Sequence, residues 1–274
     1  METLRYEVTG RIARITLDRP HRGNGITAAM PRELTECIEQ SNLDRDVHVI
    51  ALAGEGKGFC GGYDLVEYAE HQPENHDPSQ PWDPVLDYQF MGRNVRGFMS
   101  LFHSDKPVVC KVHGFCVAGG TDMALCSDLL VIAEDARIGY PPARVWGVPT
   151  TALWAHRIGD QRAKRLMFTG DLITGQQALD WGLAIDAPPP GQLDARFDAL
   201  LERIANVPVN QLVMMKLLVN QALYAQGLQA TQVLGTIFDG IARHTPEGYA
   251  FQARAGDVGF KQAVAERDAP FGGV

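Results

Sequence analysis

The sequence contains few cysteines and no pattern that is typical of a metal or redox site. Its 274 residues include five cysteines, none of which forms a C-x-x-C pair. An odd number of cysteines, three of them in apolar strands or glycine-rich turns, predicts buried reduced thiols rather than a disulfide framework. His71 and His76 have no third ligand at a metal-binding spacing. We therefore expect no bound metal.

Basic residues are also scarce, since 25 Lys and Arg face 33 Asp and Glu and the net charge is −8. This balance argues against nucleic acid or an anionic membrane as the main partner. No stretch approaches the roughly 18 consecutive apolar residues of a membrane-spanning helix, and residues 1–6 lack a signal-peptide pattern. We therefore expect a cytoplasmic protein. No G-x-S-x-G motif is present, which disfavours a serine hydrolase.

The pattern of apolar residues predicts a parallel α/β body followed by helices. With 45% hydrophobic residues, the chain is long enough for a sizeable core. Strand patterns, most of them followed by helical sequence, occupy 4–17 with a turn at Gly10, 47–53, 107–112 and 129–133. Thr27 is the expected N-cap of a helix over 27–42. Beyond residue 191 we expect only helices, over 191–206, 209–225, 228–243 and from Thr245 onward.

Two glycine-dense segments, GFCGGYDL at 58–65 and VHGFCVAGGTD at 112–122, carry the main functional signal. Each is interpreted as an apolar strand that enters a tight turn and then a helix start. This geometry leaves backbone N–H groups pointing outward without intrahelical partners. Two such turns can direct two N–H donors at one oxygen. Fixed donors of this kind stabilise the charge that forms on a thioester carbonyl oxygen in an enolate.

Together the two segments resemble the oxyanion-hole motifs of the crotonase (enoyl-CoA hydratase/isomerase) superfamily, F-x-A-G-x-D-L and V-x-G-x-x-x-G-G-G-x-E-L. The resemblance includes an R-P-x-x-x-N turn that ends at Asn24 and extends to Glu247 and Gly248. It implies an α/β fold with a crotonase-like ββα spiral core and acyl-CoA site in residues 1–190. It also implies a helical oligomerisation region in residues 191–274, which forms a homotrimer or a dimer of trimers.

The resemblance also implies the site, residue by residue. The N–H groups of Tyr63 and Gly119 would hold the thioester oxygen, and Asp122 falls at the first catalytic carboxylate. Coenzyme A is part of the substrate, so no separate cofactor is expected. The other positions implied to contact the substrate or its coenzyme A are His21, Arg22, Gly23, Gly61, Gly62, Asp64, Leu65, Phe115, Ala118, Tyr140, Pro142 and Thr150.

Several of these positions have a second interpretation. Arg22 is either a phosphate partner or a solvated arginine, and Asp64 is expected to cap the following helix. His113 is expected to be structural, bonded to nearby backbone. The proline-rich segment 71–84 is either a lid over the acyl pocket or a surface insertion. The apolar residues of the tail, among them Leu217, serve either subunit contact or the core of the chain itself.

The chain departs from the hydratase pattern at its carboxylates. The second hydratase glutamate falls at Pro142, which transfers no proton, and Asp122 is one methylene shorter than the first. The additional carboxylate of dienoyl-CoA isomerases falls at Thr150. We therefore expect inefficient conventional hydration, and Asp122 alone favours a one-base proton shuttle, as in double-bond isomerisation. A decarboxylase, a thioester hydrolase and a non-catalytic acyl-CoA-binding protein remain alternatives.

Overall fold

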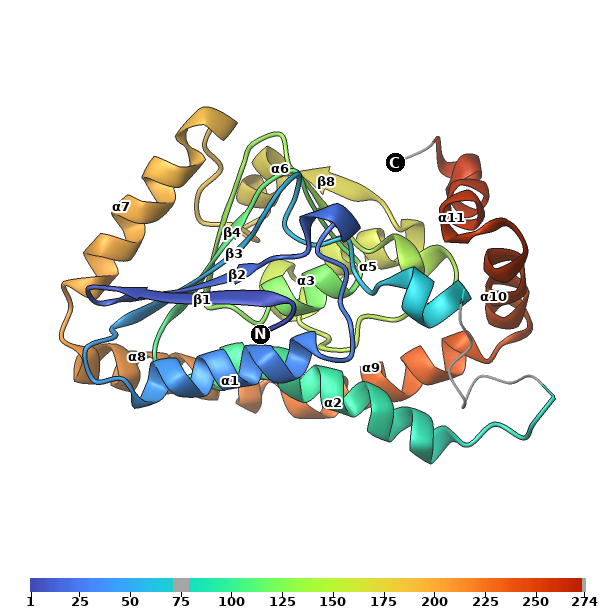
Figure 1. The fold of residues 1–274 in the computed structure, drawn as a ribbon, viewed down its shortest axis with the longest axis horizontal. Helices are drawn as coiled ribbons and strands as arrows, with labels where there is room; N and C mark the ends of the chain where they lie inside the picture. Colours follow the sequence, from blue (N-terminus) through green and yellow to red (C-terminus); the bar gives the residue numbers. More distant parts are fainter. Residues whose placement is uncertain (71–78, 273–274) are drawn as a thin grey trace.

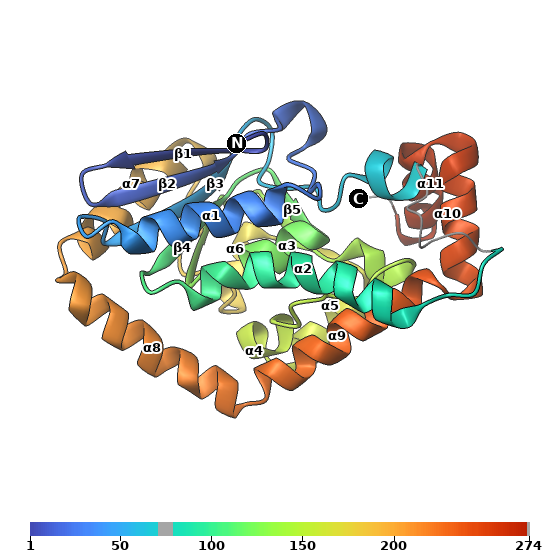
Figure 2. The ribbon, with the colours of Figure 1, turned by 60° about the horizontal axis from the view of Figure 1, so that its bottom comes forward.

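Two sheets form the centre of the molecule (Figures 1 and 2). The structure, a computed structural model, describes residues 1–70 and 79–272. In the larger sheet β1 and β2 are antiparallel and the other neighbours are parallel. Its strands, in spatial order, are β1 (Leu4–Thr9), β2 (Ile12–Leu17), β3 (Val49–Gly54), β4 (Val108–Val112) and β6 (Leu129–Ile132). The predicted strands are all present, with ends that differ by up to two residues.

The smaller sheet consists of three strands that the sequence analysis did not identify: β5 (Phe115–Val117), β7 (Arg137–Gly139) and β8 (Leu172–Thr174). Only two residues, His113 and Gly114, separate the end of β4 from the start of β5, and through them the chain passes from one sheet to the other. Strands of three residues are too short to show an alternating pattern. Their pairing depends on contacts with distant segments.

Helices cover both sheets. The helices of the body are α1 (Met30–Leu43), α2 (Pro84–His103), α3 (Gly119–Ala124), α4 (Trp154–Ile158), α5 (Asp160–Thr169) and α6 (Gly175–Asp180). The expected start of α1 was wrong. The helix begins at Met30 with Pro31 in its first turn, and the buried Thr27 Oγ1 has no hydrogen-bond partner among the described residues. Proline fits the first turn because it needs no N–H partner there.

The predicted helical tail is confirmed. It consists of α7 (Leu193–Ala205), α8 (Val209–Ala225), α9 (Leu228–Arg243), α10 (Pro246–Val258) and α11 (Phe260–Asp268). Thr245 caps α10 as expected, because its Oγ1 accepts a hydrogen bond from Gly248 N at 3.1 Å. α7 shares the hydrophobic core of the sheets, whereas α10 and α11 lie at the opposite end of the molecule (Figure 1). The division at residues 190 and 191 stays a prediction.

α8 has an inverted distribution of polar and apolar residues. Its buried residues are Lys216 and Asn220, whose side chains donate to carbonyl groups at the end of α2 and just beyond it. The outward side is apolar, and Leu217 and Leu218 are exposed. These leucines therefore do not serve the core of this chain.

The other expectations concern the cysteines, membrane-spanning helices, metal sites and segment 71–84. All five cysteines are buried and free, as predicted. Within the described ranges no helix is long and apolar enough to cross a membrane, and no cluster of metal-ligating side chains occurs. His71, His76 and most of segment 71–84 lie outside the described residues. Asp83, at the end of that segment, caps α2 by accepting from Val85 N and Leu86 N.

Candidate active site

The two glycine-rich segments, 58–65 and 112–122, lie against each other. Cys60 and Cys116 form a parallel bridge, and Val117 N donates to Cys60 O at 3.0 Å. A Cβ added to Gly62, whose φ is +93°, would lie 2.7 Å from the Ala118 Cβ. The two turns are therefore in direct contact, which a larger residue at position 62 would prevent.

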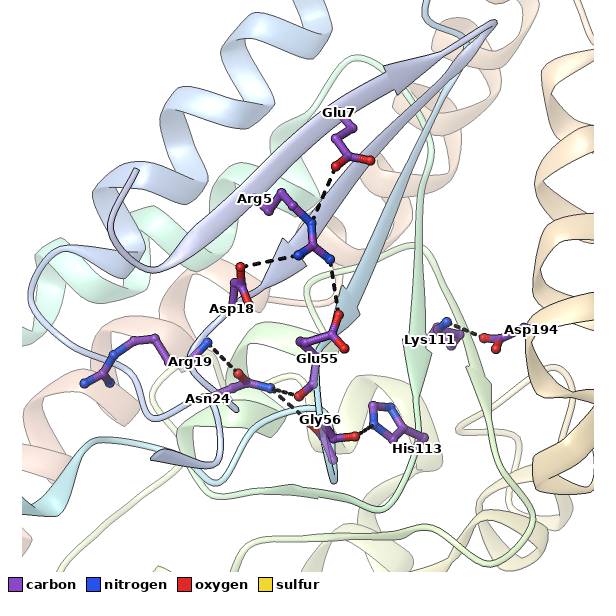
Figure 3. A network of polar contacts seen from close by, with 11 residues as sticks. Arg5, Glu7, Asp18, Arg19, Asn24, Glu55, Gly56, Lys111, His113 and Asp194 are labelled. Carbon is purple, nitrogen blue, oxygen red and sulfur yellow. Dashed lines mark hydrogen bonds and ion pairs between the residues drawn. The ribbon is translucent and has the colours of Figure 1, made fainter. Parts of the chain in front are cut away.

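Asn24 fixes the opening turn to the first of these segments (Figure 3). Its Oδ1 accepts from Arg19 N, and its Nδ2 donates to the backbone oxygens of Glu55, Gly58 and Phe59. His113 Nε2 donates to Gly56 O at 2.9 Å, in agreement with its structural interpretation. This network explains why the R-P-x-x-x-N turn and the glycine-rich segment occur together in the sequence.

A cavity of about 290 Å³ opens beside the paired turns. Its wall is largely apolar and aromatic and is assembled from distant parts of the chain. Seven of the predicted site residues line it: Gly61, Tyr63, Leu65, Ala118, Gly119, Tyr140 and Pro142. The remainder of the wall comes mainly from α2, segment 140–147 and helices α9 to α11, with Phe90, Trp146, Asp239, Arg243, Phe251, Phe260 and Asp268 among its residues.

The residues of the two predicted oxyanion donors, Tyr63 and Gly119, both line this cavity. Neither Tyr63 N nor Gly119 N donates to a protein group among the described residues. The Tyr63 ring packs over Gly119, because a Cβ on Gly119 would lie 2.8 Å from Tyr63 Cε2. Two unengaged N–H groups on one apolar wall are suited to binding a carbonyl oxygen.

Asp122 is not among the residues that line the cavity, and it is almost completely buried. Its Oδ1 accepts from Thr151 N at 3.1 Å and from Thr151 Oγ1 at 2.9 Å, while its Oδ2 has no partner among the described residues. Burial raises the pKa of Asp122 to about 7, and the charge of Asp239 contributes to the rise. A carboxyl group with this pKa is suited to both accepting and releasing a proton at neutral pH.

Tyr63 and Tyr140 line the cavity, and the charge of Asp122 acts on both of their phenols. Burial, and next the charge of Asp122, raise the pKa of both phenols well above its ordinary value, so both remain protonated. The Asn94 side chain is close enough to lower the pKa of Tyr63, but neither group completes a hydrogen bond. Both phenols are therefore neutral groups close enough to Asp122 to respond to its charge.

The residues predicted to contact coenzyme A gather at one edge of the cavity. Gly61 N donates to Gly23 O at 2.9 Å, and the Phe115 ring covers both glycines. Arg22 Nη2 binds Asp64 Oδ1 at 2.6 Å, so this guanidinium already has an anionic partner. Asp64 Oδ1 also accepts from Val66 N, which agrees with its expected capping role.

Asp64 has an additional role that the sequence analysis did not identify. Its carboxylate forms ion pairs with both Arg19 and Arg22. Burial acts to raise the pKa of Asp64, but the hydrogen bonds from the two arginines lower it overall. Among the other predicted positions, His21 lies on the exposed turn 20–22, and Thr150 is buried, with its backbone against Gly235 of α9, and is not among the residues that line the cavity.

The sequence analysis also missed the charged groups that α9 brings to the cavity. Asp239 and Arg243 line it and bind each other at 3.1 Å, and Arg243 also binds Asp87 of α2. No local motif identifies these residues, because their partners are far away in the sequence. The only indication was polar residues at helical spacing in an otherwise apolar segment.

Comparison with known proteins places this geometry in a family. The family model described as "Enoyl-CoA hydratase/isomerase" matches residues 7–249. A putative enoyl-CoA hydratase of Thermus thermophilus is 30% identical over 86% of this chain and 90% of its own length. The 1,2-epoxyphenylacetyl-CoA isomerase of Escherichia coli is 29% identical over 81% of this chain and 83% of its own length.

Solved structures agree. A crystal structure of an enoyl-CoA hydratase from Mycobacterium smegmatis superposes with a TM-score of 0.95 at 59% identity, covering 99% of this chain and 95% of that one. The expected α/β class with its crotonase-type spiral core is therefore confirmed.

Proposed function

Since the chain belongs to the enoyl-CoA hydratase/isomerase family, we propose that it binds an acyl-CoA thioester and stabilises its enolate with the N–H groups of Tyr63 and Gly119. The observation that carries this proposal is that Tyr63 and Gly119 line the same largely apolar cavity, and that neither N–H group donates to a protein group among the described residues. Donors that are held in place before the reaction stabilise the developing oxyanion without reorganisation. The coenzyme A portion lies along Gly23, Gly61 and Phe115.

Asp122 is the proton-transferring group of this proposal. Its pKa near 7 and its unpartnered Oδ2 support a role at the carbon next to the thioester carbonyl. Because Asp122 itself does not line the cavity, the hydroxyl of Tyr63 or Tyr140 passes the proton between the Asp122 carboxyl group and the substrate carbon. Proton removal and return by one carboxyl group is sufficient for double-bond isomerisation.

The cavity wall supports a bulky acyl group. Tyr63, Phe90, Trp146, Phe251 and Phe260 contribute aromatic rings to it. One relative, the isomerase of Escherichia coli, is named for a phenylacetyl-CoA derivative. We therefore include aromatic acyl groups in the substrate class.

Incubation with acyl-CoA thioesters in deuterated water tests the function. The unmodified protein should incorporate deuterium beside the carbonyl of a 3-enoyl-CoA, and Asp122→Asn should reduce the rate about 100-fold or more while thioester affinity is kept. Asp194→Asn, which removes an exposed carboxylate of α7, should leave the rate unchanged. Loss of carbon dioxide or of free coenzyme A would instead identify a decarboxylase or a hydrolase. Binding without turnover of any thioester would identify a non-catalytic binder.

The exposed side of α8 supports self-association. A helix whose buried residues are a lysine and an asparagine, and whose outward residues are apolar, is suited to contact with another subunit. The adjacent surface of α9 continues the apolar area with Leu234 and Phe238. Assembly into a homotrimer or a dimer of trimers through this surface belongs to the proposal.

A further inference from the structure

Asp239 brings a second carboxylate to the cavity from α9. It is 5% exposed, and its Oδ1 accepts from Val148 N at 3.2 Å. Val148 follows Gly147, and a Cβ on Gly147 would lie 2.8 Å from the Pro142 Cβ and 3.4 Å from the Tyr140 hydroxyl. The Asp239 carboxylate therefore lies along the part of the wall where Pro142 provides no acid or base.

The orientation of Asp239 is fixed without using all of its oxygen lone pairs. Arg243 Nε donates to Oδ2 at 3.1 Å, so each carboxylate oxygen receives one hydrogen bond from the described residues, whereas each can accept two. Arg243 also binds Asp87 at 2.9 Å. One guanidinium thus faces two carboxylates, and Asp239 keeps the capacity to accept a further hydrogen bond from the cavity side.

The other acidic residue of the cavity wall, Asp268, is held differently. Arg267 binds both of its oxygens, at 2.8 and 2.9 Å, and Arg144 binds Oδ1 at 2.9 Å. Burial acts to raise the pKa of Asp268, but these arginines lower it overall, whereas burial raises the pKa of Asp239 in spite of Arg243. Asp268 is therefore held as a counter-ion by two arginines, whereas Asp239 has one arginine partner.

We infer that Asp239 is a second catalytic carboxylate, which binds a water molecule and accepts its proton during hydration of a 2-enoyl-CoA. This inference rests on the proposed function of Tyr63, Gly119 and Asp122. The water oxygen bonds to C3, and the electron pair of the C2=C3 bond moves to the thioester oxygen. When the enolate collapses, C2 takes the proton held by Asp122. The sum is the addition of one water, and a proton transferred from Asp239 to Asp122 between turnovers restores both groups.

Two reactions, water addition and deuterium exchange, make it possible to test the inference and the proposed function independently. Water addition to crotonyl-, trans-2-octenoyl- and cinnamoyl-CoA requires both carboxylates, whereas deuterium exchange at C2 of 3-hexenoyl-CoA requires Asp122 alone. Asp239→Asn should lower water addition about 100-fold or more and leave exchange within about threefold. Asp239→Glu should restore part of the water addition. Absence of water addition by the unmodified protein, or its persistence in Asp239→Asn, would overturn the inference and leave the proposed function standing.

The matched control is Asp87→Asn, because Asp87 binds the same arginine but does not line the cavity. The charge of Asp87 raises the pKa of Asp239, so its removal should move the acid limb of the water-addition profile to lower pH while the reaction persists. An acid limb that does not move, or a parallel loss of exchange and thioester affinity in Asp239→Asn, would show a merely structural role. Among the described residues, the ionisable groups around Asp239 include Arg243, Asp87, Asp122, Tyr63, Tyr140 and, beside Asp87, His244.

Discussion

At the scale of a single residue, Asp122 shows how burial produces a group that can work at neutral pH. Two hydrogen bonds from Thr151 favour its charged form, but complete burial outweighs them and raises its pKa to about 7. The same burial disfavours the folded state whenever Asp122 is ionised. Its suitability as an acid and base therefore has a cost in stability.

This cost predicts a pH dependence. Below pH of about 4 Asp122 is protonated in both states, and between about 4 and 7 only the folded state keeps the proton. Its contribution to the free energy of unfolding therefore falls as pH rises, by at most about 1.4 kcal/mol per pH unit, and levels off above about 7. Asn lacks this titration, so Asp122→Asn should gain stability relative to the unmodified protein over that range.

Urea unfolding of both proteins between pH of about 4.5 and 8 measures the difference. A difference that stays constant over this range would mean that the pKa of Asp122 is not raised in the folded protein.

At the scale of elements, the passage from β4 to β5 depends on Gly114. Its φ is +59°, and a Cβ there would overlap the carbonyl oxygen of Lys57. Gly10, at the β1–β2 turn, has a nearly equal φ of +56°, but a Cβ there would contact nothing within 4 Å. A comparison of alanine substitutions at these two glycines therefore distinguishes the effect of backbone strain from that of steric overlap.

Gly10→Ala should cost about 1 kcal/mol, because only the left-handed backbone is strained. Gly114→Ala should cost about 3 kcal/mol or more, because the overlap also forces the two glycine-rich segments apart. Thermal and urea unfolding of both variants test this expectation. Equal destabilisation would show that the close approach of Lys57 is unimportant.

The same elements show what the sequence could predict. The longer strands and the tail helices have local patterns, and they were predicted correctly. Segment 58–65, expected to begin as an apolar strand, contains only isolated bridges at Cys60 and Tyr63. Thr27 was assigned as a cap because its residue type fits, but Pro31 determines where α1 begins. The position of Asp239 could not be predicted, since its partner Val148 lies 91 residues away in the sequence. Proximity of this kind depends on packing rather than on local pattern.

At the scale of the whole molecule, the proposed assembly depends on the apolar outward face of α8. Lys216 and Asn220 attach this helix to the body, at whose edge it lies (Figure 2), and its apolar residues are exposed. Leu218 is 68% exposed on that side. A single folded chain therefore presents an apolar surface that is larger than isolated surface residues would explain.

Leu218→Glu should convert the assembled protein to monomers, because burying a carboxylate at a subunit contact has a large desolvation penalty. Phe168→Glu is the control, since Phe168 is 80% exposed on α5 and outside this surface. Light scattering coupled to size-exclusion chromatography measures both. An unmodified protein that is already monomeric would contradict the proposed assembly.

The cavity wall extends from Gly61 to Asp268, and this span has a consequence during translation. While the chain emerges from the ribosome, both glycine-rich segments are available and can pair long before α9, α10 and α11 have been synthesised. The nascent protein can therefore form the two glycine-rich turns, but Trp146 has no Phe251 of α10 to pack against it. Until α9, α10 and α11 have been synthesised, this part of the wall is uncovered, and the cavity is complete only after these helices have packed against it.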